Sequence, residues 1–195
     1  SFLPTNLRNI KTVLDDMDAV AKVEIENNPF QKNLTPQQTE AVKTLSELRG
    51  FAPTLLYGVT GSGKTEVYIR CIQEQLLQQK SVLLLAPEIA LTPQLEQRVK
   101  DQFGPAVGMY HSKMTPAKRY KAWKQFRSGE INILIGTRSA AMMSAPKLGL
   151  IIIDEEHDAS YKQHEGFKFS ARDLAIKRAQ MLKIPIILGS ATPSL

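Results

Sequence analysis

The sequence predicts an α/β fold built as a doubly wound, mainly parallel sheet. Apolar runs rich in Val, Ile and Leu alternate along the chain with segments that carry apolar residues at helical spacing. The runs are nearly continuous, as expected of strands that are covered on both faces of a parallel sheet. Glycine or polar residues follow almost every run, and the carboxyl ends of strands are where such sheets bind ligands. The fold class therefore also predicts where functional residues gather.

The regular elements are expected to begin with a helix near residue 34, where Thr35 is a suitable N-cap and Pro36 the first helical residue. The alternation of strands and helices then favours βα units over separate layers of sheet and helix. The predicted strands are TLLYG (54–58), VLLLAP (82–87), INILIG (131–136), LGLIIIDEE (148–156) and IPIILGSA (184–191). The predicted helices are 66–79, 93–103, 116–127 and 171–183.

Residues 1–32 have a different pattern from the rest of the chain. A short stretch with helical spacing is followed by the turn-rich segment NNPFQKN. We expect residues 1–32 to be the tail of a preceding domain or a linker, and residues 33–195 to form one domain. The chain begins with Ser1 rather than Met, which suggests a fragment of a longer protein.

Composition excludes several classes of protein. The 195 residues are 43% hydrophobic and 23% charged, which is ordinary for a globular domain. No run approaches the roughly 18 apolar residues of a membrane span, and no signal peptide is visible, so we expect a cytoplasmic location. A single cysteine, Cys71, excludes an intrachain disulfide and a cysteine cluster for zinc. The net charge of +6 is compatible with nucleic-acid binding but does not establish it.

The clearest motif is GVTGSGKT at residues 58–65, which fits the phosphate-loop pattern GxxxxGK[ST] at every fixed position. It follows a predicted strand and opens a predicted helix, the context that the pattern requires. Its glycines let backbone N–H groups point at phosphates near a positive helix terminus. Lys64 would reach the β- and γ-phosphates, and Thr65 would ligate Mg²⁺. The expected phosphate-binding residues are Gly58, Val59, Thr60, Gly61, Ser62, Gly63, Lys64 and Thr65.

A second motif, DEEH at residues 154–157, directly follows the run LGLIII. An acidic residue at the end of a buried strand suits Mg²⁺, and a neighbouring carboxylate can polarise the attacking water. Asp154 is therefore the expected metal residue and Glu155 the expected catalytic base. An acidic helix N-terminus would also account for two acids, but not for their position downstream of a phosphate loop.

Taken in order, GVTGSGKT, APEIALTPQ, IGTRSA, DEEHDASYKQ and GSATPS resemble the conserved motifs of superfamily 2 helicases with a DEAH-type acidic motif. The wording within them is most similar to the primosomal replication-restart helicases, over roughly residues 34–195. This resemblance implies a RecA-like lobe that binds ATP and Mg²⁺. It also implies a 3′-to-5′ DNA helicase that acts in replication restart and primosome assembly at stalled forks.

The resemblance assigns further roles to matching positions. Gln38, in LTPQQ, would read the adenine edge, since an amide can both donate to and accept from one base. Thr137 and Arg138 would contact the single-stranded backbone together with residues 87–94. Ser190 and Thr192 would couple hydrolysis to movement. Gln38 could instead be a solvated helix residue, and Thr137 and Arg138 ordinary loop or cap residues. Ser190 and Thr192 could simply begin a helix or loop after the last strand.

Aromatic and basic residues interleave in DASYKQHEGFKFSAR, residues 158–172. Aromatic rings can stack on bases and cations can follow phosphates. The stretch resembles the aromatic-rich loop of the family, which signals DNA occupancy to the ATP site. The alternative is that its rings belong to the core. The DNA-binding or coupling candidates of this stretch are Tyr161, Phe167, Phe169 and Arg172.

A further basic segment, residues 111–127, carries lysines and arginines without a single acid. It is either a solvated helix face or a contact for duplex DNA or a partner protein.

The resemblance also implies parts that are absent from this sequence: a second helicase lobe that supplies an arginine, and a zinc module. We expect the chain alone to bind nucleotide weakly and to hydrolyse it slowly. Single-stranded and forked DNA, primosome proteins and single-strand-binding protein are the implied partners, and no membrane is. Three alternatives are another ATP-dependent translocase, a small P-loop phosphotransferase and a non-catalytic interaction module.

Overall fold

The computed structural model describes residues 33–59, 61–88, 93–164, 166 and 168–192. The expected segment 1–32 lies outside the described residues. The chain forms a six-stranded sheet in which every neighbouring pair of strands is parallel, which confirms the predicted fold class. Its strands are β1 (Pro53–Tyr57), β2 (Ser81–Leu85), β3 (Val107–Tyr110), β4 (Ile133–Gly136), β5 (Leu148–Ile153) and β8 (Ile186–Ser190). They lie in the order β1-β8-β5-β2-β4-β3.

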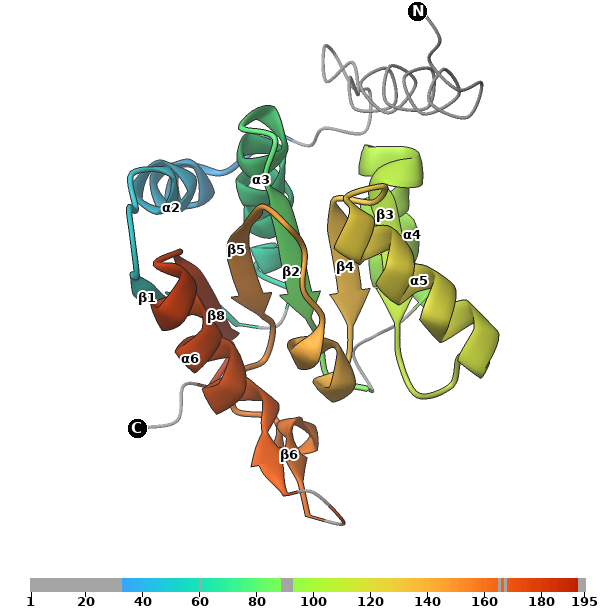
Figure 1. The fold of residues 1–195 in the computed structure, drawn as a ribbon. Coiled ribbons are helices and arrows are strands. Elements are labelled where there is room, and N and C mark those ends of the chain that lie inside the picture. The colour runs from blue at the N-terminus through green and yellow to red at the C-terminus, as the bar shows by residue number, and fades with distance from the viewer. Residues whose placement is uncertain (1–32, 60, 89–92, 165, 167, 193–195) are drawn as a thin grey trace, which may run out of the picture.

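Helices cover both faces of this sheet, as Figure 1 shows. On one face lie α2 (Pro36–Ser46), α3 (Lys64–Leu77) and α4 (Pro93–Phe103), and on the other α5 (Pro116–Ser128) and α6 (Ala171–Leu182). Each face of the sheet has its own hydrophobic core, and successive strand residues point into opposite cores. Leu84 and Ile152 lie in the core on the α3 side, whereas Leu83 and Ile151 lie in the core on the α6 side. These four side chains are fully buried, so each is worth about 1.5–3 kcal/mol of hydrophobic stabilisation. Among the described residues, no helix is long and apolar enough to cross a membrane.

The parallel register brings the carboxyl ends of the strands to one edge of the sheet. Leu85 at the end of β2 pairs with Gly136 of β4 and with Ile153 of β5, and Tyr57 of β1 pairs with Ser190 of β8. The loops that follow these residues carry the motifs found in the sequence. The sheet therefore gathers segments from across the chain into one site.

Strand β1 corrects one expectation. The run TLLYG was expected to be buried on both faces, but β1 lies at the edge of the sheet, and Leu55 and Tyr57 are 49% and 62% exposed. An apolar run does not by itself tell an edge strand from a central one, because the number of neighbouring strands is set by topology.

Several short elements were not predicted. They are β3, the antiparallel pair β6 (Lys162–Gln163) and β7 (Phe169–Ser170), and the 3-10 turns η1 (Gly104–Ala106), η2 (Arg138–Met142) and η3 (Ala159–Tyr161). The sequence of β3 is VGMY, too short and too interrupted to stand out as an apolar run. The predicted start of α2 is confirmed: Thr35 is the N-cap and forms a capping box with Gln38.

Candidate active site

The loop between β1 and α3 is shaped by its glycines. Gly61 and Gly63 have φ angles of +82° and +84°, a region that other residues rarely adopt. Gly63 is the N-cap of α3 and supplies no side-chain cap, so the first N–H groups of the helix are left for another acceptor. A Cβ atom at Gly58 would meet the Ser62 hydroxyl at 2.5 Å. The loop is thus a backbone cradle at a positive helix end, although Thr60 lies outside the described residues.

Lys64 joins this loop to the acidic motif. Its side chain is 10% exposed, and its Nζ donates to the Gly58 carbonyl oxygen at 2.6 Å. The same Nζ lies 3.3 Å from Glu155 Oε1. The expected convergence of the lysine and the acidic pair at one edge of the sheet is therefore confirmed.

Asp154 is fixed at the end of β5 by its backbone and by its side chain. Its N–H donates to the Leu85 carbonyl oxygen at 2.8 Å, which continues the β2–β5 ladder by one residue. The Tyr161 hydroxyl donates to the Asp154 carbonyl oxygen at 2.6 Å, and the Tyr68 hydroxyl donates to Oδ1 at 2.9 Å. Burial raises the pKa of the Asp154 carboxyl, while the Tyr68 hydrogen bond and the nearby Lys64 ammonium oppose that rise.

The two tyrosines beside Asp154 are both buried. Burial, reinforced by the charge of Asp154, raises the pKa of both the Tyr68 and the Tyr161 phenol. Both hydroxyls therefore stay protonated and act as donors over the physiological pH range.

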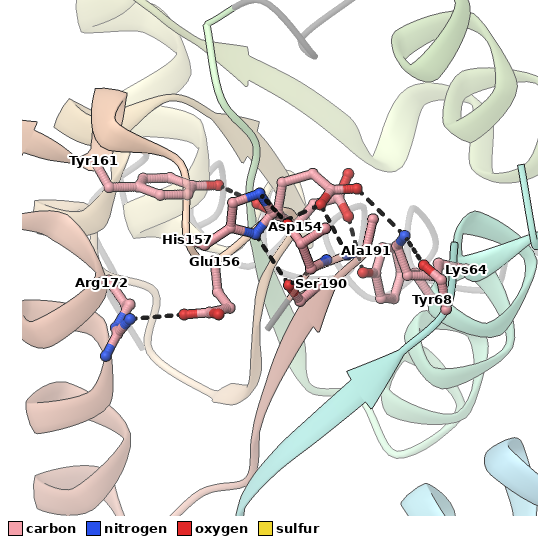
Figure 2. Close-up of polar contacts among 12 residues, drawn as sticks. Lys64, Tyr68, Asp154, Glu156, His157, Tyr161, Arg172, Ser190 and Ala191 are labelled. Atoms are coloured by element: carbon pink, nitrogen blue, oxygen red, sulfur yellow. Dashed lines mark hydrogen bonds and ion pairs between the residues drawn. The ribbon is translucent and has the colours of Figure 1, made fainter. Parts of the chain in front are cut away.

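Glu155 and His157 tie the end of β5 to the end of β8. Glu155 has a positive φ of 45°, and its Oε2 accepts from the Ala191 N–H at 3.1 Å. His157 lies with Nδ1 3.0 Å from Ser190 Oγ and Nε2 3.2 Å from Thr192 Oγ1. Ser190 and Thr192, expected to couple hydrolysis to movement, are thus in direct contact with the acidic motif. Figure 2 shows Ser190 beside His157.

Gln38 contacts the phosphate loop from α2. Its Oε1 accepts from the Thr35 N–H at 2.9 Å, and its Nε2 donates to the Ser62 carbonyl oxygen at 2.9 Å. A Cβ atom at Gly63 would collide with the same amide. Recognition of adenine by Gln38 stays a prediction, but the amide already supports the loop.

The aromatic stretch is placed differently from the expectation of exposed, base-stacking rings. Tyr161 is only 2% exposed and belongs to the α6-side core, and Phe169 is partly buried against the same core. Arg172 NH1 lies 2.7 Å from Glu156 Oε2 and forms an ion pair with that buried carboxylate. Phe167 lies outside the described residues.

Of the two candidates after β4, Arg138 contacts this stretch. Thr137 is 3% exposed, so its hydroxyl is not presented on the surface. Arg138 NH1 donates to the carbonyl oxygens of Ser160 and Lys162, at 3.2 and 2.8 Å, and so holds η3 and β6. Residues 89–92 of the expected 87–94 contact segment lie outside the described residues.

Sequence reasoning missed Tyr68, Glu156 and His157 as site residues. A signal existed for Tyr68, because it lies one helical turn after Lys64 and therefore on the same face of α3. Glu156 and His157 were within the acidic motif, but their partners Arg172 and Ser190 come from later elements.

Helix α5 carries the basic segment. Lys121, Lys124 and Arg127 are exposed, and the Arg127 guanidinium lies 5.5 Å from the centre of the Trp123 ring. Within the described part of the chain, none of the lysines or arginines of residues 111–127 forms an ion pair. Both readings of this segment, a solvated face and a binding face, stay open.

These features define a P-loop ATPase site at the edge of a parallel sheet. A profile of the DEAD/DEAH box helicases matches residues 35–194, and the chain belongs to this family. It is thus a DEAD/DEAH box helicase domain, and membership of this family implies the use of ATP and Mg²⁺.

Particular relatives refine that class. The replication restart protein PriA of Synechocystis is 50% identical over 163 residues, which cover 83% of this chain and 20% of that protein. The same protein of Helicobacter pylori is 46% identical over 180 residues, covering 92% of this chain and 28% of that protein. The chain thus spans between 20% and 28% of the length of these relatives.

Two solved structures share the fold. RecG bound to a three-way DNA junction gives a TM-score of 0.62 at 22% identity, with 94% of this chain and 23% of that chain covered. The DEAD-box helicase Mss116 bound to ssRNA and UDP-BeF gives 0.61 at 18% identity, with 91% and 41% covered. At these identities the likeness shows the RecA-like fold alone.

Proposed function

We propose that residues 33–195 form the ATP-binding lobe of a 3′-to-5′ DNA helicase that acts in replication restart and primosome assembly at stalled forks. The observation that carries the ATP-dependent part is the convergence of Lys64 with Glu155 at 3.3 Å, beside Asp154. The replication-restart part is supported by the identity of 40–50% to relatives of that name.

The residues fit MgATP. Mg²⁺ is commonly held by one or two carboxylates together with substrate phosphates, rather than by a full cage of protein ligands. The described residues contain no cluster of three or more His, Cys, Asp and Glu side chains, but they offer the Asp154 carboxylate and the Thr65 hydroxyl. The burial that raises the pKa of Asp154 is the cost that a bound cation would offset. Mg²⁺ would neutralise charge that develops on the transferred phosphoryl group.

The chain's own groups then have distinct tasks. The Lys64 ammonium and the N–H groups of the loop hold the phosphates, because they are the cation and the donors at the start of α3. Glu155 is the general base that orients the attacking water. Its carboxylate is aimed by the Lys64 ammonium on one oxygen and by the Ala191 N–H on the other.

Coupling would use the same contacts. Bound phosphates would attract the Lys64 ammonium, which forms an ion pair with Glu155. Weakening that ion pair would free the Glu155 carboxylate to shift, and with it the hydrogen bond to the Ala191 N–H. His157 would pass the same shift to Ser190 and Thr192 at the end of β8. The DNA path would include Arg138, Phe167, Phe169 and Arg172, whereas the buried Tyr161 and Thr137 would act by supporting them.

Other partners rest on the family resemblance alone. They are a second lobe that completes the ATP site, single-stranded and forked DNA, primosome and single-strand-binding proteins, and a zinc module elsewhere in the protein. A cytoplasmic location belongs to the same set of proposals.

The test is steady-state ATPase activity of the full-length protein without DNA and with single-stranded, duplex and forked DNA. We expect DNA to stimulate ATP turnover. Lys64→Ala should reduce the DNA-stimulated turnover rate by on the order of 10²–10³-fold. The exposed Lys43 provides a matched control, and Lys43→Ala should leave turnover unchanged.

Unwinding of partial duplexes with a 3′ or a 5′ single-stranded tail gives the direction of movement. If the ATP turnover rate does not change with DNA but rises with a small-molecule phosphoryl acceptor, the protein is instead a phosphotransferase.

A further inference from the structure

We infer that Tyr68 is a positioning residue that holds the carboxylate of Asp154 in the orientation needed to bind the metal ion. The inference rests on the proposed function, because that function makes Asp154 a metal residue. The Tyr68 hydroxyl donates to Asp154 Oδ1 at 2.9 Å across 86 residues of sequence (Figure 2).

Helix α3 aims this hydroxyl. Tyr68 lies one turn after Lys64 and two residues into the buried part of α3, so its side chain lies beneath the phosphate loop. Only 2% of the residue is exposed, and the ring is enclosed by the core between α3 and the sheet. A ring so enclosed has little rotamer freedom, which fixes the position of the donor relative to Asp154.

Gly189 makes the contact possible. A Cβ atom at Gly189 would overlap the Tyr68 hydroxyl, would lie 3.0 Å from its Cζ and would lie 3.3 Å from Asp154 Oδ1. A ring enclosed by the core cannot move aside as a flexible surface side chain could. The absence of a side chain at Gly189 of β8 therefore leaves the space in which the Tyr68 hydroxyl and the Asp154 carboxylate meet.

The chemistry of the pair explains the need for it. Asp154 is partly buried, and a carboxylate in such a site depends on hydrogen-bond donors to keep one orientation. A protonated phenol supplies such a donor without adding a positive charge that would repel a metal ion. Partners of this kind commonly change metal affinity 10–100-fold when they are removed.

The experiment measures metal binding directly on the full-length protein. Mn²⁺ replaces Mg²⁺ as the probe, and its binding in the presence of ADP is followed by electron paramagnetic resonance. We expect Tyr68→Phe to weaken Mn²⁺ binding about 10–100-fold, while the affinity for ADP in EDTA stays within about twofold of wild type. The Mg²⁺ concentration for half-maximal ATPase activity should rise in parallel.

Two further variants separate positioning from general loss of packing. Ile72→Val removes one buried methylene from the same helix, one turn further on, and should leave Mn²⁺ binding unchanged despite a lower melting temperature. Gly189→Ala keeps the Tyr68 side chain, but the added Cβ takes the space that the hydroxyl occupies beside Asp154 Oδ1, so the hydrogen bond cannot form as it does in the wild type. The variant should therefore reproduce the loss of Mn²⁺ affinity. This variant keeps the inference testable if Tyr68→Phe is too unstable to purify.

Each outcome decides between the two levels of the proposal. Wild-type Mn²⁺ affinity in Tyr68→Phe or in folded Gly189→Ala overturns the role of Tyr68 and leaves the proposed function standing. An equal loss in Ile72→Val overturns it too, since packing alone would then explain the effect. A wild-type protein that binds no Mn²⁺ with ADP contradicts the proposed function itself.

Discussion

Tyr161 offers the sharpest test of how the structure departs from the sequence pattern. Tyr161→Phe removes one hydroxyl and keeps the ring. The lost bond is a 2.6 Å hydrogen bond to the carbonyl oxygen of Asp154, made by a residue that is 2% exposed. A net hydrogen bond is worth about 0.5–1.5 kcal/mol, and a buried acceptor left without a partner costs about 1–3 kcal/mol. We therefore expect the free energy of unfolding to fall by about 1–2 kcal/mol.

Urea denaturation of the chain measures this loss, followed by circular dichroism and by the fluorescence of its single tryptophan, Trp123. The midpoint should fall with no change in slope, because the surface exposed on unfolding is the same. In a thermal scan the loss corresponds to a decrease of about 2–8 °C for a chain of this length. Tyr120→Phe is the matched control: Tyr120 is 64% exposed, and its variant should differ from wild type by less than about 0.5 kcal/mol.

A ring that stacked on DNA bases from the surface would behave otherwise. Tyr161→Phe would then leave stability unchanged, and Tyr161→Ala would cost little beyond DNA affinity. The buried ring instead predicts a loss of about 3–5 kcal/mol for Tyr161→Ala, from the cavity it leaves. Equal stability of wild type, Tyr161→Phe and Tyr161→Ala would refute the core assignment.

Three further predictions concern the rest of the domain. Glu155→Gln should retain ATP binding while turnover falls about 10²–10⁴-fold, measured by equilibrium binding and single-turnover hydrolysis; equal losses in both would argue against a general base. Arg172→Gln should lower the free energy of unfolding by about 1–2 kcal/mol. This is less than the about 3–5 kcal/mol usual for a broken buried ion pair, because the Arg172 side chain is 37% exposed. Adding Glu156→Gln to the same chain should recover part of the lost stability, as measured by a double-mutant cycle. Burial raises the pKa of the Cys71 thiol to about 12, so about one thiol in ten thousand is ionised at pH 8, and alkylation should proceed only as fast as the domain opens. Alkylation of folded protein at the rate of a free thiol would contradict that burial.

The sequence could predict the parts of the site that follow from one rule. Parallel strands end at one edge, so Lys64 after β1 and Asp154 after β5 had to meet there once the apolar runs were read as strands. The same rule brings Ser190 and Thr192 at the end of β8 to the acidic motif. Local signals sufficed for the N-cap Thr35 as well.

Contacts that depend on side-chain direction could not be predicted in the same way. Basic residues surround Tyr161 in the sequence. An exposed ring that stacks on bases and a core ring beside a polar loop can both have such neighbours, so the pattern does not distinguish them. The difference lies in η3, which places the ring in the core on the α6 side of the sheet. The prediction that β1 is buried on both faces failed for a similar reason. Leu55 and Tyr57 are 49% and 62% exposed, and the sequence alone does not show that β1 lies at the edge of the sheet.

The two phenols at Asp154 act on different parts of this residue, one on its backbone and one on its side chain. Tyr161 bonds to the peptide oxygen and so fixes where the residue stands, whereas Tyr68 bonds to the carboxylate and so fixes where the side chain points. Loss of the first should be seen in the free energy of unfolding, because a buried backbone acceptor goes unpaired in the folded state. Loss of the second should be seen in the affinity for the metal ion, because the carboxylate keeps its place but not its orientation. Removing one atom from each ring therefore distinguishes the stability of this edge of the sheet from its chemistry.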